Sequence, residues 1–240
     1  TLESARYMVK SITLCFVVAI IVGTGMFYQF GRGVWYPEVL KYTGKKTVAE
    51  VIQAHGANAS EMLLPAFERA GVGYPPNKLA LLAFKDTKVL QLWAASDVGN
   101  YALIKTYPIK AASGVLGPKL RESDRQVPEG IYKVVGFNPN SSYHLSMKLN
   151  YPNEFDLRQA KAEGRDQPGT NIFIHGRAVS VGCLAMGDPA IEELFSLVNA
   201  TGIDDTTASR ASNAAPDIVL KIRCISGREA TDVESSSRPI

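Results

Sequence analysis

A cysteine with a histidine eight positions before it is the strongest chemical signal in this sequence. His175 ends the apolar run at residues 171–175, and Cys183 directly follows Gly182. A thiol is a weak nucleophile at neutral pH unless a neighbouring group favours the thiolate, and an imidazole within hydrogen-bond reach can act as that base. The pair therefore predicts a cysteine nucleophile, Cys183, with His175 as its base.

The residues around this pair predict a strand, a turn and a helix that would hold it. Residues 171–175 are typical of a buried strand that delivers the histidine. A helix is expected to begin with Asp188 as its N-cap and Pro189 at its first position, and to continue to about Asn199. Its positive dipole end would favour the thiolate of the cysteine.

The same residues also have purely structural interpretations. Cys183 would serve as a small buried hydrophobic side chain, or as the disulfide partner of Cys224, although three cysteines do not make a disulfide framework. His175 would be a hydrogen-bonded structural residue. In the catalytic interpretation Gly182 lets the backbone approach closely, so the N–H groups of Gly182 and Cys183 would bind an oxyanion.

The two other histidines are expected to have separate roles. His55 stands in a predicted break between helices and is interpreted as exposed. His144 lies on a predicted strand and is interpreted as a ligand-contacting or supporting residue. Because the three histidines have no acidic partners at ligand spacing, the sequence predicts no metal site.

Length and composition limit the class of protein. A chain of 240 residues allows one substantial domain with smaller additions. The content of 46% hydrophobic and 20% charged residues predicts that most of the chain folds. The net charge is only +3, and no basic stripe is interleaved with aromatic residues, so the sequence predicts no nucleic-acid partner.

The N-terminal region is an apolar segment with two interpretations. Residues 12–30 carry no charge and are long enough to span the core of a bilayer. Arg6 and Lys10 precede this segment, and Gly23-Thr24-Gly25 resembles a cleavage site, which is typical of a signal peptide. Either interpretation predicts that the remainder is exported to the periplasm or the extracytoplasmic face. An uncleaved segment would anchor it in the inner membrane.

The remaining pattern predicts an α+β, mostly β, fold in which a few helices flank the sheet. Residues 31–46 show no sustained period and are interpreted as a connector. The predicted helices are 47–54, a second that begins at Asn58 or Ser60 and ends at 70, and 155–162. The predicted strands are 79–84, 89–93, 101–107, 131–137, 143–149 and 218–225. A turn at residues 138–140 is expected to link the fourth and fifth strands.

These elements suggest four regions along the chain. They are a signal peptide or anchor (1–30), a linker and helical segment (31–76), a catalytic domain (77–226) and a polar tail without fixed structure (227–240). Residues 111–130 are rich in Gly, Pro and charge, so they are interpreted either as a functional loop or as a solvated charged loop. The basic residues of this segment would suit a carboxylate-bearing ligand.

Several motifs in a fixed order resemble one enzyme family. Ile174-His175-Gly176 followed by Ser180-x-Gly182-Cys183 is similar to the signature of the L,D-transpeptidase (YkuD-type) family of cell-wall enzymes. The motifs that precede it match the YafK-type branch of that family. They are Gly117-Pro-Lys-Leu-Arg-Glu, Asp124-Arg-Gln-x-Pro-Glu-Gly, Asn138-Pro-Asn-Ser and His144-Leu-Ser, followed later by Cys183-x-Ala-Met. The resemblance covers about residues 78–200.

The resemblance implies an L,D-transpeptidase-like β-sandwich or barrel with a cysteine nucleophile. Cys183 would attack the carbonyl of the diamino acid at position three of a peptidoglycan stem peptide, with His175 as the base. The carbonyl of Gly176 would orient the imidazole. Gly182 and Ser180 would belong to the backbone that binds the oxyanion or orients the catalytic groups. Lys119, Arg121, Arg125 and His144 would contact the substrate. No metal or organic cofactor is implied.

The resemblance leaves the second half of the reaction open. The usual His before Gly-Cys is Val181 here, and Leu184-Ala185 stand where an Arg usually follows the cysteine. The interval between His175 and Cys183 is also shorter than in typical cross-linking members. A murein L,D-transpeptidase is the first expectation. The alternatives are a hydrolase (an L,D-carboxypeptidase, or an amidase that releases wall-attached lipoprotein) and a non-catalytic cell-wall-binding module.

Overall fold

The computed structural model describes residues 2–96, 100–202 and 218–223, which fall into two compact units. The first unit is residues 1–45 and the second is residues 46–240. The chemistry predicted from the sequence belongs entirely to the second unit. The polar tail 227–240 and Cys224 lie outside the described residues.

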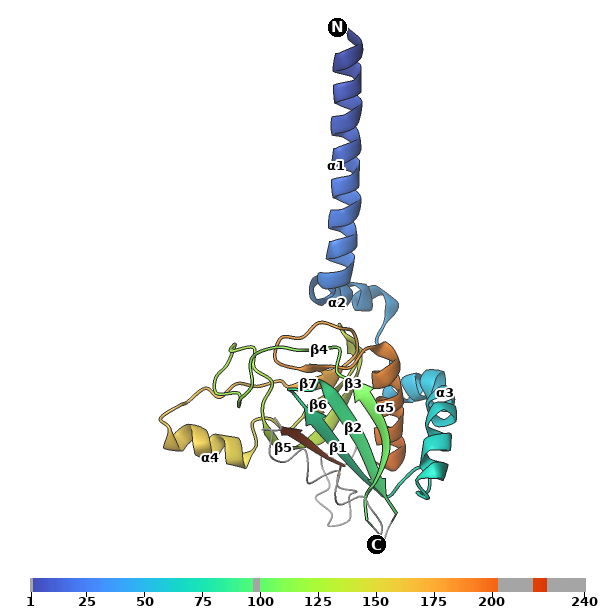
Figure 1. Cartoon of the computed structure of the whole chain (residues 1–240), viewed down its shortest axis with the longest axis vertical. Coiled ribbons are helices and arrows are strands. Elements are labelled where there is room, and N and C mark those ends of the chain that lie inside the picture. The colour runs from blue at the N-terminus through green and yellow to red at the C-terminus, as the bar shows by residue number, and fades with distance from the viewer. Residues whose placement is uncertain (1, 97–99, 203–217, 224–240) are drawn as a thin grey trace. The chain divides into compact units, whose positions relative to one another are not determined.

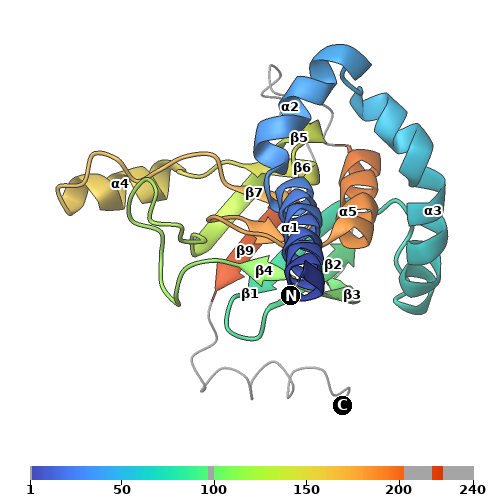
Figure 2. The ribbon, with the colours of Figure 1, turned by 90° about the horizontal axis from the view of Figure 1, so that it is seen from above.

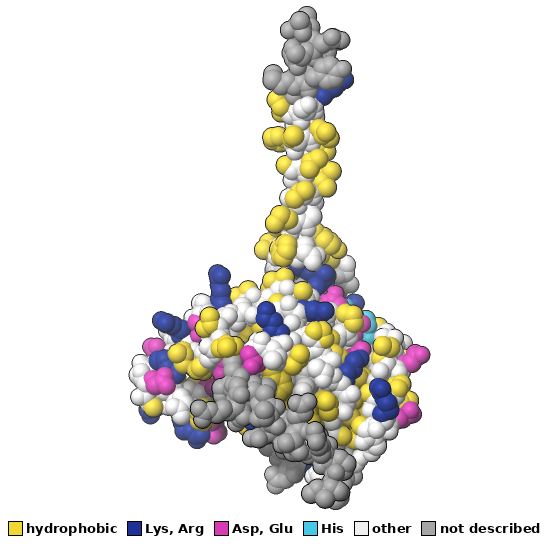
Figure 3. Space-filling view, viewed as in Figure 1, with side chains coloured by type: hydrophobic (Ala, Val, Ile, Leu, Met, Phe, Trp, Pro, Cys, Tyr) yellow, Lys and Arg dark blue, Asp and Glu magenta, His cyan; other side chains and the backbone are white. Residues whose placement is uncertain are grey.

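The first unit consists of two helices, α1 (Leu2–Phe30) and α2 (Arg32–Thr43). Lys10–Phe30 is, within the described part of the chain, the one stretch of helix long and apolar enough to cross a membrane, with a mean hydropathy of 2.1. None of this stretch is buried, and Figure 3 shows hydrophobic side chains distributed along its visible face. The apolar segment predicted at residues 12–30 is therefore helical.

Helix α2 occupies the segment that the sequence suggested was an irregular connector. It contains Pro37 and buries no residue, which explains why no apolar period marks it. Aromatic contacts hold it instead: the rings of Tyr28 and Trp35 stack with centroids 5.1 Å apart. The guanidinium of Arg32 lies 4.3 Å from the ring centroid of Tyr36. The helix ends at Thr43 and is capped by Gly44, whose φ is +80°.

The second unit is built on a nine-stranded sheet, and its α+β, mostly β, class is as predicted (Figures 1 and 2). The order of strands across the sheet is β3-β2-β1-β9-β5-β6-β7-β8-β4. The strands are β1 (Lys78–Phe84), β2 (Val89–Ala95), β3 (Ala102–Pro108), β4 (Ala111–Ala112), β5 (Gly130–Ser141), β6 (His144–Leu149), β7 (Phe173–His175), β8 (Leu184–Ala185) and β9 (Ile218–Arg223).

The antiparallel meander β1–β2–β3 confirms the three strands expected between residues 79 and 107. β9 lies between β1, to which it is parallel, and β5, to which it is antiparallel, so the last described strand closes the gap between the two halves of the sheet. Beyond β5 the antiparallel pairs β5–β6 and β6–β7 lead to the parallel pair β7–β8.

The turn between β5 and β6 was predicted at the wrong place. β5 continues through residues 138–140 to Ser141, with an irregular register in that stretch, and the turn is formed by Ser142 and Tyr143. The Asn-Pro-Asn sequence is accommodated as an irregularity within the strand rather than as its end. His144 follows the turn with a φ of +76°, a left-handed conformation that is uncommon for a residue with a side chain.

Helix α3 (Val48–Arg69) is one helix, where the sequence indicated two with a break at His55-Gly56. A capping box between Thr47 and Glu50 starts it. A glycine inside a helix costs only about 1 kcal/mol, which the packing of a continuous buried face outweighs. That face consists of Val51, Ala59, Leu63, Ala66 and Phe67.

Helix α5 (Asp188–Thr201) packs against β1, β6 and β7, and α3 packs against α5 (Figure 2). Gly187 is the N-cap of α5 and Asp188 is already helical, so the predicted cap is displaced by one residue. Helix α4 (Glu154–Ala162) lies at the opposite end of this unit from α3 and α5 (Figures 1 and 2). It agrees with the helix predicted at 155–162.

We expect Leu63→Ala to destabilise the second unit much more than Leu64→Ala, although the two residues are neighbours of the same type. Leu63 is fully buried in the core, whereas Leu64 is 42% exposed. The buried truncation should lower the free energy of unfolding by about 2–5 kcal/mol, and the exposed one by less than about 1 kcal/mol. Urea unfolding followed by near-ultraviolet circular dichroism measures both. Equal losses would contradict the packing of α3 described here.

Candidate active site

His175 is the last residue of β7 and is held in one orientation by its neighbours. Its side chain is only 2% exposed. Nδ1 lies 2.6 Å from the carbonyl oxygen of Gly176, and because a carbonyl only accepts, Nδ1 carries the proton in this contact. Nε2 is then the basic nitrogen. The ring of Tyr143 lies beside the imidazole, with centroids 4.7 Å apart, and limits its rotation.

Cys183 stands immediately before β8, which is parallel to β7 and pairs Ala185 with His175. It is a free thiol, partly buried, with Sγ 3.9 Å from the carbonyl oxygen of Asn171. Cys183 and His175 line the same cavity of about 220 Å³. The other lining residues are Asn138, Ser141, Ser142, Tyr143, Ser146 and Phe173. The structure thus brings the two residues singled out by the sequence into one small cavity.

Burial sets the protonation of both groups. It raises the pKa of the Cys183 thiol above its ordinary value, while a hydrogen bond from the backbone of Phe173 and the charge of Lys119 act in the opposite direction. Burial also lowers the pKa of His175, against a smaller opposing effect of the hydrogen bond to Gly176. Both shifts favour a neutral thiol beside a neutral imidazole at pH 7. Such an imidazole is suited to accept the thiol proton during attack.

Ser113, which the sequence did not single out, fastens the turn that carries the cysteine. Its Oγ accepts the N–H of Gly182 at 2.5 Å and donates to the carbonyl of Arg125 at 2.8 Å. The hydroxyl oxygens of Ser180 and Ser113 lie 3.1 Å apart, and the hydroxyl of Ser180 donates to the carbonyl of Cys183 at 2.6 Å. The N–H of Gly182 would therefore have to leave Ser113 before it could bind an oxyanion.

Lys119 is committed to partners inside its own loop. It is buried, and Nζ donates to Asp124 at 2.6 Å and to the carbonyl of Arg121 at 2.9 Å. Burial opposes ionisation of Asp124, but hydrogen bonds from Lys119 and from three backbone N–H groups lower its pKa to about 2. A role of Lys119 at the substrate carboxylate remains a prediction. Its charge already acts on the Cys183 thiol from within the loop.

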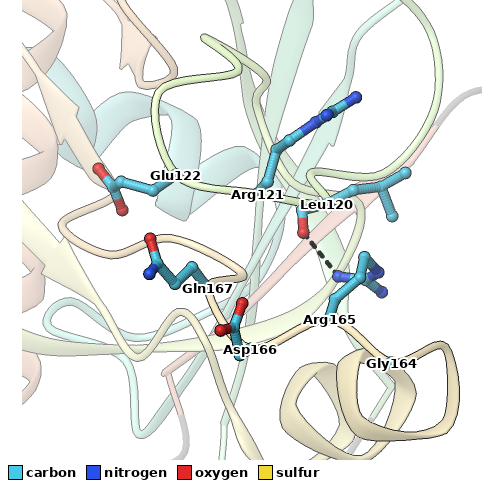
Figure 4. Close-up of a pocket in the computed structure, with 7 residues that line it drawn as sticks. All are labelled: Leu120, Arg121, Glu122, Gly164, Arg165, Asp166 and Gln167. Atoms are coloured by element: carbon cyan, nitrogen blue, oxygen red, sulfur yellow. Dashed lines mark hydrogen bonds between the residues drawn. The ribbon is translucent and has the colours of Figure 1, made fainter.

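Arg121 lines a second hollow that shares no residue with the cavity of Cys183 (Figure 4). This hollow is larger, about 640 Å³, but it contains no nucleophile and is lined mostly by charged and polar residues. Figure 4 shows Arg121 pointing away from Asp166 and Gln167, while Arg165 donates to the carbonyl of Leu120 at 2.6 Å. We therefore place the candidate chemistry at the smaller cavity. Contact of Arg121 with a substrate remains a prediction.

The two remaining predicted contacts lie in different surroundings. Arg125 is exposed and has a φ of +55°. Its backbone carbonyl accepts a hydrogen bond from the hydroxyl of Ser113. His144 does not line the cavity; its Nε2 lies 2.6 Å from Glu192 on α5. His144 opens β6 in a left-handed conformation, and its side chain contacts α5, so contact of His144 with a substrate remains a prediction.

Gly176 is confined to a space that admits no side chain. A Cβ at this position would lie 2.7 Å from the carbonyl oxygen of Tyr143 and 2.7 Å from Oδ1 of Asp188, which accepts the N–H of Arg177. The glycine thereby lets the turn after β5 and the start of α5 approach the carbonyl that holds His175. The His-Gly motif therefore needs glycine at position 176, because any side chain there would collide with Tyr143 and Asp188.

We expect Gly176→Ala to reduce both the stability of the second unit and the reactivity of Cys183. The added methyl group must displace backbone, which costs typically 1–3 kcal/mol and moves the carbonyl that orients His175. Gly73→Ala is the matched control, because nothing lies within 4 Å of a Cβ there. Thermal unfolding and the rate of thiol alkylation test the pair. Unchanged alkylation in Gly176→Ala would contradict the orienting role of this position.

The alkylation rate of Cys183 by iodoacetamide should rise with pH through an inflection above the ordinary thiol pKa. The thiolate is the reacting form, and burial raises the pKa of the thiol, so little thiolate exists at pH 7. Replacing Cys15 and Cys224 by Ser restricts the measurement to one thiol. A high plateau already reached between about pH 5 and 7 would instead indicate a thiolate–imidazolium pair and contradict the neutral pair.

Three kinds of comparison, with curated proteins, with solved structures and with family models, relate the chain to known proteins. A curated relative named "Putative L,D-transpeptidase YafK", from Escherichia coli (strain K12), is 37% identical over 117 residues, which is 48% of this chain and 45% of the relative. The chain thus matches less than half of that relative's length. Pgp2 of Campylobacter jejuni, described as a helical cell shape determining protein, is 20% identical with a TM-score of 0.45, over 62% of this chain and 49% of that one.

Two further solved structures are similar at lower scores. Bd1075 of Bdellovibrio bacteriovorus is 20% identical with a TM-score of 0.42, over 66% of this chain and 55% of that one. L,D-transpeptidase 1 of Mycobacterium tuberculosis is 12% identical with a TM-score of 0.32, over 61% of this chain and 62% of that one.

The family comparison agrees with the motifs around His175 and Cys183. The model of the L,D-transpeptidase catalytic domain, YkuD, matches residues 82–214, more than half of the 240 residues, and this range includes β2 to β8, the residues that line the cavity and both candidate catalytic residues. The chain therefore belongs to the L,D-transpeptidase (YkuD) catalytic domain family.

Proposed function

We propose that this protein is a cysteine acyl-transfer enzyme that acts on peptidoglycan stem peptides, as a murein L,D-transpeptidase. The observation that carries the proposal is the single cavity lined by both Cys183 and His175, with Nδ1 of the histidine fixed by the Gly176 carbonyl. Membership of the L,D-transpeptidase family supports the substrate class. The acyl donor would be the diamino acid carbonyl at position three of the stem peptide.

The proposed first half-reaction uses the neutral pair described above. As Sγ of Cys183 attacks the carbonyl carbon, Nε2 of His175 takes the thiol proton. The imidazolium is stabilised by the 2.6 Å contact between Nδ1 and the Gly176 carbonyl. When the tetrahedral intermediate collapses, the bond to the terminal residue breaks and His175 returns its proton to the leaving amine. A thioester on Cys183 remains.

The second half-reaction resolves this thioester. An acceptor amine gives up its proton to His175 and attacks the thioester carbonyl, which forms a new peptide bond. The sulfur leaves and recovers the proton from His175. Water in place of the amine gives hydrolysis through the same steps, so the choice of acceptor decides the reaction.

Hydrolysis is a second candidate, as an L,D-carboxypeptidase or an amidase that releases wall-attached lipoprotein. The cavity of about 220 Å³ is smaller than typical ligand pockets, so it offers little room for a second peptide beside the donor. Val181 is 62% exposed, and Leu184 and Ala185 are buried, so these three positions present no polar group to an acceptor. A water acceptor needs neither the room nor such a group.

We also propose that the second unit works outside the cytoplasm, where stem peptides occur. The apolar helix Lys10–Phe30 supports this placement, because it is long enough to serve as a signal peptide or as an inner-membrane anchor.

Muropeptide analysis by mass spectrometry tests the proposed activity. Sacculi incubated with the full chain, purified in detergent, should gain cross-links if an amine is the acceptor, or lose stem residues or attached lipoprotein if water is. Cys183→Ala should lower the rate at least about a thousandfold, because the covalent step is lost. Cys15→Ala, which changes a thiol in the first unit, is the matched control.

The possible results separate the hypotheses. Cross-links that depend on Cys183 support the transpeptidase, and Cys183-dependent release supports the hydrolase. Sacculi that remain unchanged while the protein binds them would overturn the enzymatic proposal in favour of a wall-binding module. Activity that persists in Cys183→Ala would remove the cysteine from the mechanism.

A further inference from the structure

Two histidines and a glutamate from three different elements converge on the surface of the second unit. His55 belongs to α3, His144 follows the turn between β5 and β6, and Glu192 belongs to α5. Oε1 of Glu192 lies 2.6 Å from Nε2 of His144, and Oε2 lies 3.3 Å from Nδ1 of His55. One ligand atom from each residue can be chosen so that all three lie within 4.8 Å of one another.

Each of these side chains is placed by well-packed structure. His55 lies four residues from both Val51 and Ala59, which are buried, so it is on the face of α3 that packs against α5. His144 is fixed by its pairing with Ser141 across the turn. The three elements meet in the folded unit although the sequence separates them widely, so the cluster is a product of the fold.

We propose that His55, His144 and Glu192 form a binding site for a divalent transition-metal ion, with Zn²⁺ as the best candidate. Two imidazoles and one carboxylate are a donor set that zinc uses, together with water in a fourth position. Imidazole nitrogen also disfavours Mg²⁺ and Ca²⁺, which prefer oxygen ligands. The donor chemistry therefore selects the class of ion.

The observed spacing is close to what coordination requires. Zinc–nitrogen and zinc–oxygen distances of about 2.0–2.2 Å place neighbouring ligands of a tetrahedral site roughly 3.3 Å apart. The contacts of 3.3 Å and 2.6 Å from Glu192 to the two rings need only a small opening to admit the ion. The side chains of His55, His144 and Glu192 are 28%, 27% and 22% exposed, which provides an entry path and room for a water ligand.

The site is separate from the candidate active site but adjoins it through the chain. None of its three residues lines the cavity of Cys183. However, His144 directly follows Tyr143, whose ring lies against the imidazole of His175. A bound ion would fasten α3 and α5 to the turn that limits the rotation of that imidazole. The inference assigns the ion a structural task and does not depend on the proposed reaction.

Metal titration of the full chain tests this site. The protein is purified in detergent, stripped with a chelator, and studied with Cys15, Cys183 and Cys224 replaced by Ser, so that thiols do not bind the ion. Isothermal titration with Zn²⁺ should give one ion per chain, and Co²⁺ should give the intense visible absorption of a four-coordinate complex. His55→Ala, His144→Ala and Glu192→Gln should each weaken the affinity at least tenfold.

The remaining histidine provides the matched control. The sequence has three histidines, so His175→Ala removes the only one outside the cluster and should leave the affinity unchanged. Zn²⁺ should also raise the thermal unfolding midpoint of the parent chain but not that of Glu192→Gln, a change that preserves the shape of the side chain. Circular dichroism confirms that each variant is folded.

Two results would overturn the proposal. One is the absence of stoichiometric binding in the parent chain, which would leave the cluster as a hydrogen-bonded group of side chains. The other is binding that remains unchanged in the folded double variant of His55 and His144, which would place the ion elsewhere.

Discussion

The contact between Nδ1 of His175 and the carbonyl of Gly176 is the interaction on which the candidate site depends. It assigns the proton to Nδ1 and leaves Nε2 basic, and it opposes the effect of burial on the imidazole. Its geometry requires a backbone without a side chain at position 176, where the turn of Tyr143 and the carboxylate of Asp188 both come within 2.7 Å of a Cβ. The β5–β6 turn and the start of α5 are therefore arranged around one carbonyl group.

The loop that precedes β5 is ordered by polar contacts that compensate for its lack of regular structure. The ammonium of buried Lys85 donates to the carbonyls of Gly117 and Val127, and Lys119 pairs with Asp124. A buried charge without partners would be costly, so these pairs restrict the loop to a conformation that satisfies them. Ser113 extends the same network to the turn that carries the cysteine. The charge near the thiol is consequently held in place by the loop.

Features set by local chemistry could be predicted from the sequence, and those set by tertiary packing could not. The meander, α4, and the strand and helix that flank the Cys–His pair follow from apolar periods and capping residues, and the family follows from motifs in order. The break expected at His55-Gly56 did not occur, because the buried face of α3 outweighs the propensity of one glycine. The contacts of Ser113, and the convergence of His55 and His144 on Glu192, join distant parts of the chain and have no local signature.

The parallel pairing of β7 with β8 has a consequence for how this site can vary. Ala185 is held opposite His175 by strand register, and Cys183 is two residues before it. The spacing between Cys183 and His175 is then determined by the sheet, while residues 176–182 form the connection between them, whose length the strand pairing does not prescribe. Insertions there would change the rim of the cavity without separating the reacting groups. In the proposed reaction, the length of this connection would affect how the second reactant reaches the cavity and would leave the spacing of the two side chains unchanged.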